Sequence, residues 1–427
     1  MSKRRSFLKQ ISSLITGGFV FSSDSFKSTL YRNFKTQLAQ ASTEDQFWHF
    51  VREQFPLTKN RTYLNNGTMG PCPHSVMDVV NTATIYSNTE ASYGGGEVAR
   101  ERIAKFINAK KEEISLTHNA TEGINLIVWG LPLKKGDEVI LTTHEHVGMA
   151  TPWLNRAKLH GIVLKPFIPG STAQENLNRI NDLINRKTRV IAVPHITCTN
   201  GLVLPAKEIS QLAREKGLFS FFDGAHAPGS LVLDMKDVDC DFYAACGHKW
   251  LLGPLGTGFM FVKEKLLDVL QTYHVGGHAI SDGKWELSEK IQDFTEYVPT
   301  AHRYDYGTQN PALHKGLAAA TDFFTTIGIQ KAVGRGHTLA KYLQDNLLNF
   351  GDAIEMLTPT EADSRASMIG FRLKKMDYRD FGKLAHENRF TIRLVWEGTQ
   401  NCIRISTHLY NSVEEVDRFL ELVESVV

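Results

Sequence analysis

The chain has few cysteines, no internal repeats and almost no net charge, and each of these absences excludes a class of protein. Its five cysteines are scattered through 427 residues with no Cys-x-x-Cys pair, so neither a zinc site nor a disulfide framework is indicated. The 48 basic and 46 acidic residues give a net charge of +2, which removes the general electrostatic case for nucleic-acid binding. With 42% hydrophobic residues, the chain is predicted to fold around a large core, in two or three domains by a rough prior of ~150 residues each.

The one clear charge asymmetry lies at the N-terminus. Residues 1–41 carry seven lysines or arginines and one acid, Asp24. The basic start at 3–9 precedes an apolar run at 11–21, which has the form of an export signal and is too short to span a bilayer. Because the start reads Lys-Arg-Arg-Ser-Phe-Leu-Lys, it resembles a twin-arginine signal, which directs the export of folded proteins. We therefore expect residues 1–41 to be an export signal, the location to be periplasmic or otherwise exported, and no membrane contact beyond the signal.

Cleavage of this signal is left open. Ala39-Gln40-Ala41 has the small-x-small form of a cleavage site, but three basic residues separate it from the apolar run. Retention of the segment as an uncleaved anchor is the alternative.

The middle of the chain alternates short apolar runs with amphipathic segments. Six runs are strand candidates, at residues 138–142, 162–168, 189–194, 218–222, 242–246 and 257–262. Between them, residues 175–186 and 206–216 place their apolar side chains on one helical face. This alternation predicts an α/β fold with a mostly parallel sheet and helices on both sides. In such sheets, ligands bind at the carboxyl ends of the strands.

The C-terminal part follows a different pattern. Residues 392–394 and 402–406 are predicted strands, and Ser412 with Glu415 forms a capping box ahead of a predicted helix. These elements predict a smaller α+β domain. The expected division is an N-terminal segment at 42–60 that packs with the small domain, a large cofactor-binding domain at 61–305 and the small domain at 306–427.

An acid and a lysine stand at the ends of two consecutive predicted strands. Asp223 follows Phe221-Phe222, and Lys249 follows the next apolar run. Because parallel strands place their carboxyl ends at one edge of a sheet, the two side chains are expected to converge. Pyridoxal phosphate (PLP) needs such a pair. An amine forms a Schiff base with it, and a carboxylate keeps its pyridine nitrogen protonated so that the ring accepts electrons.

The stretches Asp223-Gly-Ala-His-Ala-Pro and Gly247-His-Lys-Trp resemble the class V aminotransferase family of PLP enzymes. This family has fold type I and includes cysteine desulfurases, selenocysteine lyases, kynureninases and isopenicillin N epimerases. The resemblance covers roughly residues 60–427. It implies PLP as cofactor, a small-molecule substrate with an amino group, a homodimer, and a seven-stranded sheet in the large domain.

The resemblance assigns the residues around the cofactor ring one by one. Lys249 matches the Schiff-base lysine, Asp223 the partner of the pyridine nitrogen, and His226 the group that hydrogen-bonds the phenolic oxygen. His146 matches the histidine that stacks on the ring, with His144 as the alternative. Lys249, Asp223 and His146 are therefore the expected catalytic residues.

A second set of matches concerns the phosphate group. Ala120 and Thr121, at the start of an apolar helix, match the family's phosphate-binding pair, and His248 joins them beside the lysine. A helix N-terminus suits this role because its free N–H groups and dipole favour an anion. Thr308 matches a residue that reaches the phosphate of the neighbouring subunit.

For the substrate, Arg404 matches the family arginine that holds a carboxylate, and Asn66 is a further candidate. A planar guanidinium suits this task because it binds both oxygens at once. Desulfurases carry a nucleophilic cysteine on a mobile loop shortly before this arginine, whereas Cys402 stands only two residues from it. Cys198 and Cys246 replace an asparagine and a serine of the desulfurases. These differences favour the isopenicillin N epimerase branch and disfavour sulfur transfer.

The sequence thus predicts an enzyme that moves a proton at the α-carbon of an amino-group substrate, as an aminotransferase or an epimerase does. A cysteine desulfurase or selenocysteine lyase is the alternative within catalysis. If the chain is not an enzyme, the alternative is a non-catalytic scaffold protein that keeps the fold. Some exported members of the family, which modify a siderophore such as pyoverdine, combine a similar signal with this fold. The chain resembles them in location and fold alone.

Overall fold

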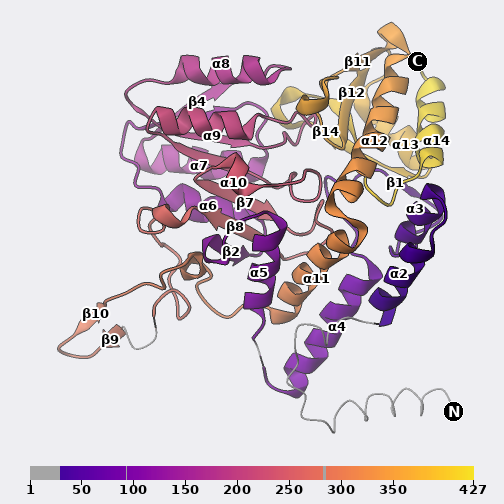
Figure 1. Ribbon diagram of the computed structural model, residues 1–427. Coiled ribbons are helices and arrows are strands. Elements are labelled where there is room, and N and C mark those ends of the chain that lie inside the picture. The colour runs from indigo at the N-terminus through magenta and orange to yellow at the C-terminus, as the bar shows by residue number, and fades with distance from the viewer. Residues whose placement is uncertain (1–28, 93, 282–284) are drawn as a thin grey trace, which may run out of the picture.

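A computed structural model describes residues 29–427 apart from 93 and 282–284 (Figure 1). Its centre is a seven-stranded sheet with the order β2-β8-β7-β6-β5-β3-β4. The strands are β2 (Ile114–Thr117), β3 (Glu138–Thr142), β4 (Val163–Phe167), β5 (Thr188–Pro194), β6 (Phe219–Asp223), β7 (Phe242–Cys246) and β8 (Gly258–Val262). All neighbours pair in parallel except β8, which is antiparallel to both β2 and β7. The predicted α/β fold with a mostly parallel seven-stranded sheet is confirmed.

Six of these strands coincide with the six predicted apolar runs, and their ends differ by one or two residues at most. The seventh, β2, had no candidate in the sequence because it is four residues long and alternates Ile114 and Leu116 with Ser115 and Thr117. All four of these side chains are buried, since β2 lies under α5 and α6 at the edge of the sheet (Figure 1).

Helices cover both faces of this sheet. The helices of this part are α4 (His74–Thr89), α5 (Gly96–Phe106), α6 (Ala120–Gly130), α7 (Val147–His160), α8 (Ala173–Leu183), α9 (Ala206–Glu215) and α10 (Met235–Val238). One core lies between the sheet and α6 with α7, and the other between the sheet and α5, α8 and α9. Because successive strand residues point to opposite faces, Phe221 joins the first core and Phe222 the second.

The C-terminal part has a four-stranded antiparallel sheet with the order β11-β12-β15-β14. Its elements are α11 (Pro311–Ile327), α12 (Ile329–Leu348), β11 (Ile354–Met356), β12 (Met368–Leu373), α13 (Tyr378–Glu387), β14 (Arg393–Val395), β15 (Cys402–Ser406) and α14 (Val413–Glu424). The predicted strands 392–394 and 402–406 are confirmed as β14 and β15. The capping box is also confirmed, because the Ser412 hydroxyl accepts from the Glu415 N–H and the Glu415 carboxylate accepts from the Ser412 N–H.

The N-terminal part of the described chain packs on this body. It consists of α2 (Thr29–Gln40) and α3 (Glu44–Arg52), followed by β1 (Thr62–Tyr63), which pairs with β13 (Phe390–Thr391). Arg52 of α3 forms an ion pair of 2.6 Å with Glu415 of α14. Phe34 of α2 is 1% exposed and stacks on Phe323, so cleavage after Ala41 would remove an aromatic ring from the core. Of the predicted signal at residues 1–41, residues 1–28 lie outside the described residues, and residues 29–40 form α2.

Two further features complete the fold. A hairpin of β9 (Trp285–Leu287) and β10 (Gln292–Phe294) projects away from the sheet (Figure 1). None of the helices between residues 29 and 427 that the model describes is long and apolar enough to cross a membrane.

The capping box gives a stability prediction. Replacing Ser412 with alanine removes the acceptor for the Glu415 N–H, and the free energy of unfolding is expected to fall by about 1 kcal/mol. Denaturant titration of the purified protein measures this change. Ser412→Thr is the matched control, because it keeps the hydroxyl and should stay near the wild-type value; equal stability of all three proteins would contradict the prediction.

Candidate active site

A cavity of about 260 Å³ opens at the carboxyl edge of the large sheet. It lies where the ends of β6 and β7 meet the N-terminus of α6. Residues 67–68 and the β14–β15 part of the small sheet close its other side. Its lining residues are Gly67, Thr68, Asn119, Ala120, Thr121, Ile124, His146, Cys198, Asp223, Ala225, His226, Cys246, His248, Lys249, Arg393, Glu397 and Arg404. The cavity therefore brings together eight of the ten residues that the sequence predicted for the site.

Lys249 and His226 face each other in this cavity, with 3.4 Å between Nζ and Nε2. The Trp250 indole N–H donates to His226 Nδ1 at 3.1 Å. Because an indole can only donate, Nδ1 must be the unprotonated nitrogen, and the imidazole proton lies on Nε2. Burial, reinforced by Lys249, holds the pKa of His226 well below its ordinary value. His226 is thus a neutral ring whose Nε2–H points at the lysine.

Asp223 is the buried acid of the site, at 5% exposure. Its Oδ1 accepts from the Ala225 N–H at 2.9 Å, and no other described residue donates to the carboxylate. Burial raises its pKa, while that hydrogen bond and the nearby Lys249 lower it. A carboxylate in this position is stabilised by a protonated nitrogen placed against it, which is the environment that a pyridine nitrogen requires.

His146 is the N-cap of α7, where its Nδ1 accepts from the Gly148 N–H at 3.0 Å. Its pKa is lowered by burial and by Lys249, so the ring is neutral with its proton on Nε2. The preceding residue, Glu145, fixes this turn because its Oε1 accepts from the N–H and the hydroxyl of Thr142. His144 does not line the cavity and instead bonds Thr199 at 3.0 Å.

The N-terminus of α6 forms a cradle for an anion. Asn119 caps the helix by accepting from the Glu122 N–H at 2.9 Å, and Ala120 and Thr121 in the first turn line the cavity. Beside them, the Nδ1 atom of His248 is buried without a hydrogen-bond partner, and burial lowers the pKa of this histidine to about 4. A phosphate group placed here fits, because it would receive the helix N–H groups, the Thr121 hydroxyl and His248.

Arg404 is the buried cation of the site, at 3% exposure. One Nη donates to the Cys198 carbonyl, the other to the Thr68 hydroxyl at 3.4 Å, and Nε has no partner. Burial lowers its pKa to about 10, so it stays charged at neutral pH. No acidic side chain of the described residues forms an ion pair with it. A buried charge of this kind calls for an anionic ligand.

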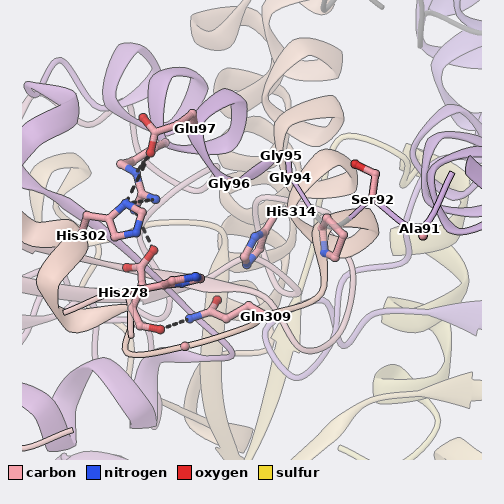
Figure 2. Close-up of a pocket in the computed structure, with 14 residues that line it drawn as sticks. Ala91, Ser92, Gly94, Gly95, Gly96, Glu97, His278, His302, Gln309 and His314 are labelled. Carbon is pink, nitrogen blue, oxygen red and sulfur yellow. Dashed lines mark hydrogen bonds and ion pairs between the residues drawn. The ribbon is translucent and has the colours of Figure 1, made fainter. Parts of the chain in front are cut away.

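Two predicted residues lie outside this cavity. Asn66 is fully buried and accepts from the Tyr410 hydroxyl at 2.9 Å, so that Gly67 and Thr68 line the cavity in its place. Thr308 is exposed and lies between Gly307 and Gln309, two residues that line a second cavity of about 550 Å³ (Figure 2). In a single protomer, the structure does not bring Thr308 to Lys249, and the role of Thr308 toward a neighbouring subunit stays a prediction.

Two lining residues had no signal in the sequence. Arg393, the first residue of β14, and Glu397, in the turn between β14 and β15, form an ion pair of 2.5 Å at the cavity. Their spacing of four residues signals a pair on a helix, but here Gly398 has a φ of +57° and the chain turns back instead. The ion pair depends on this turn, so the sequence alone could not predict it.

The cysteines near the site are protonated thiols at neutral pH. Burial raises the pKa of Cys198 to about 12, and that of Cys246 and Cys402 to about 11. Cys198 and Cys246 line the cavity, whereas Cys402 is fully buried within β15 and does not. All five cysteines are free of disulfide bonds.

Comparisons with known proteins identify the family of this chain. The family model for class V aminotransferases matches residues 77–419. A cysteine desulfurase of Haloferax volcanii is 30% identical over 388 residues, which cover 85% of this chain and 88% of that protein. An isopenicillin N epimerase of Amycolatopsis lactamdurans is 28% identical over 395 residues, which cover 89% and 98%.

Two solved structures at 25% identity have the same fold. The apo cysteine desulfurase of Thermococcus onnurineus superposes with a TM-score of 0.79, covering 88% of this chain and 97% of that one. A lysine-to-alanine variant of C-DES, with glycine covalently linked to its PLP cofactor, superposes with a TM-score of 0.79, covering 88% and 99%. The cofactor of this chain is accordingly PLP, and the chain belongs to the class V aminotransferase family.

Proposed function

We propose that this class V PLP enzyme exchanges the amino group, or inverts the α-carbon, of an amino-acid substrate and uses no protein thiol as a nucleophile. The observation that carries the proposal is the presence of Lys249 and Arg404 in one cavity, where Arg404 is a buried cation without an acidic partner. An α-amino carboxylate satisfies both groups, with its amine toward Lys249 and its carboxylate on Arg404.

Each residue of the site then has a defined task. Bound through Lys249, PLP supplies an electron sink for the α-carbon. Arg404 holds the carboxylate and so fixes which bond of the α-carbon faces Lys249. The amine of Lys249 would take the α-proton, the Nε2–H of His226 would donate to the phenolic oxygen of PLP, and Asp223 would stabilise a proton on the pyridine nitrogen. Return of the proton to the other face of the α-carbon would invert that carbon, whereas amino transfer would leave the amine of the substrate on the cofactor and release the corresponding keto acid.

A cysteine desulfurase is the second candidate. It is favoured by the names of similar proteins, such as the desulfurase of Haloferax volcanii. A desulfurase of the kind outlined from the sequence needs a thiolate that reaches the substrate sulfur. A thiol with a pKa of about 11 to 12, as in Cys198, Cys246 and Cys402, is ionised in only about one molecule in 10⁴ to 10⁵ at pH 7. The site therefore supports amino-group chemistry better.

The proposal includes a location and an assembly. The basic start at residues 3–9 and the apolar run after it support export by the twin-arginine route, in which a protein that has already bound its cofactor is moved in the folded state. The exposed position of Thr308 supports a homodimer in which this residue serves the neighbouring subunit. Fractionation of cells that produce the full chain, and light scattering of the purified protein, test these two points.

Removal of the thiols tests the chemistry. Separate Cys198→Ala and Cys402→Ala variants are expected to keep amino transfer to a keto acid within about threefold of wild type, because neither thiol takes part. The assay follows the absorbance of the bound cofactor and the new amino acid. Cys240→Ala is the matched control for packing, since Cys240 is buried away from the cavity. A Cys402→Ala variant that loses more than about a hundredfold of cysteine-dependent sulfide release, with no amino transfer in wild type, would establish the desulfurase instead.

The anion cradle gives a cofactor-binding prediction. Thr121→Val removes a hydroxyl donor and leaves a side chain of the same shape, so the dissociation constant for PLP is expected to rise about tenfold or more. Equilibrium dialysis of PLP against the protein measures it. Thr121→Ser keeps the hydroxyl and should bind PLP nearly as tightly as wild type; an unchanged constant in Thr121→Val would remove Thr121 from the phosphate site.

A further inference from the structure

The Arg393–Glu397 pair brings both of its charges to the wall of the active-site cavity. The Glu397 side chain is only 10% exposed and that of Arg393 is 31% exposed. Burial raises the pKa of Glu397, but hydrogen bonds from the backbone and the Arg393 charge outweigh it and hold the pKa below its ordinary value. The second carboxylate oxygen accepts from the Trp396 N–H at 3.1 Å. Glu397 is therefore an ionised group that Arg393 and the Trp396 N–H stabilise.

The loop that carries Glu397 is held against the large domain. A Cβ at Gly398 would lie 2.9 Å from the Thr143 carbonyl oxygen, so the backbone approaches the β3–α7 turn closely. Gln400 contacts His144 of the same turn, with 3.1 Å between Nε2 atoms. These contacts fix Glu397 and Arg393 at the cavity rather than in solvent.

Most of the acidic and basic side chains that line the cavity have an assigned partner. The cavity's acidic and basic lining residues other than histidine are Asp223, Lys249, Arg393, Glu397 and Arg404, and burial keeps its three histidines neutral. Asp223 and Lys249 serve the cofactor, and Arg393 is neutralised by Glu397. Among the lining residues, Arg404 alone remains without an acidic partner.

We infer that the substrate brings a single carboxylate and an uncharged side chain, and that the Arg393–Glu397 pair is the specificity device that rejects acidic side chains. This inference rests on the proposed function. A second carboxylate would have to face the Glu397 carboxylate or displace it from Arg393, which would leave Glu397 buried beside a like charge. An amide side chain meets neither penalty, because it can donate to Glu397 and accept from Arg393.

Glutamine and glutamate are the matched substrates for the test, because they differ only in amide against carboxylate. In wild-type holoenzyme, kcat/KM for glutamine is expected to exceed that for glutamate by about tenfold or more. In Glu397→Gln, Arg393 loses its counter-charge and the preference is expected to shift toward glutamate by a similar factor. The control is Glu355→Gln, which opens the exposed Arg372–Glu355 pair of 2.7 Å in the small sheet and should leave the wild-type ratio unchanged.

Binding without chemistry separates this inference from the proposed function. Pentanoate and glutarate have the same carbon chain and carry one and two carboxylates, and neither has an amine to react. Isothermal titration of the holoenzyme is expected to show tighter binding of pentanoate, and Glu397→Gln should narrow or reverse the difference. If no amino acid is converted while this selectivity is found, the proposed function fails and the inference about the pair stands. Equal or tighter binding of glutarate, binding of neither acid, or a wild-type preference for glutamate overturns the inference.

Discussion

The parallel pairing of β6 with β7 is the constraint on which the site depends. Asp223 pairs with Ala244, so both strands reach the same edge of the sheet, and three residues after Cys246 the chain presents Lys249. Position 224 has no room for a side chain, because a Cβ there would lie 1.8 Å from the Tyr243 ring. A shift of either strand would therefore change the distance between the acid and the amine on which the cofactor chemistry rests.

Burial of this edge decides the protonation of the groups around it. The two cores on either side of the sheet exclude water, and charged imidazoles are costly there. The histidines of the site are consequently neutral, and neighbouring donors set their tautomers: Trp250 for His226, and the Gly148 N–H for His146. Each ring therefore presents an N–H from Nε2, which means that the donors of the site are arranged before any ligand binds.

Much of this could be predicted from the sequence, because strand periodicity and helix capping act over a few residues. The ends of β6 and β7, and with them Asp223 and Lys249, follow from apolar runs that are buried on both faces. The tautomer of His226 and the Arg393–Glu397 pair could not be predicted, since both depend on contacts made after folding: the Trp250 indole N–H that donates to His226 Nδ1, and a loop turned by Gly398. Asn66 shows the limit of residue-by-residue transfer, because it anchors the Tyr410 hydroxyl while its neighbours reach the cavity.

The chain is similar to a desulfurase and to an epimerase at about the same identity, so overall similarity does not separate the two reactions. What distinguishes reactions on such a scaffold is the group presented opposite the lysine. In this chain the segment between β14 and β15 presents a paired carboxylate, and it lies close against the β3–α7 turn through Gly398 and Gln400. Cys402, the cysteine nearest to this segment in the sequence, lies within β15 and is fully buried. The turn that places Glu397 at the cavity carries no cysteine.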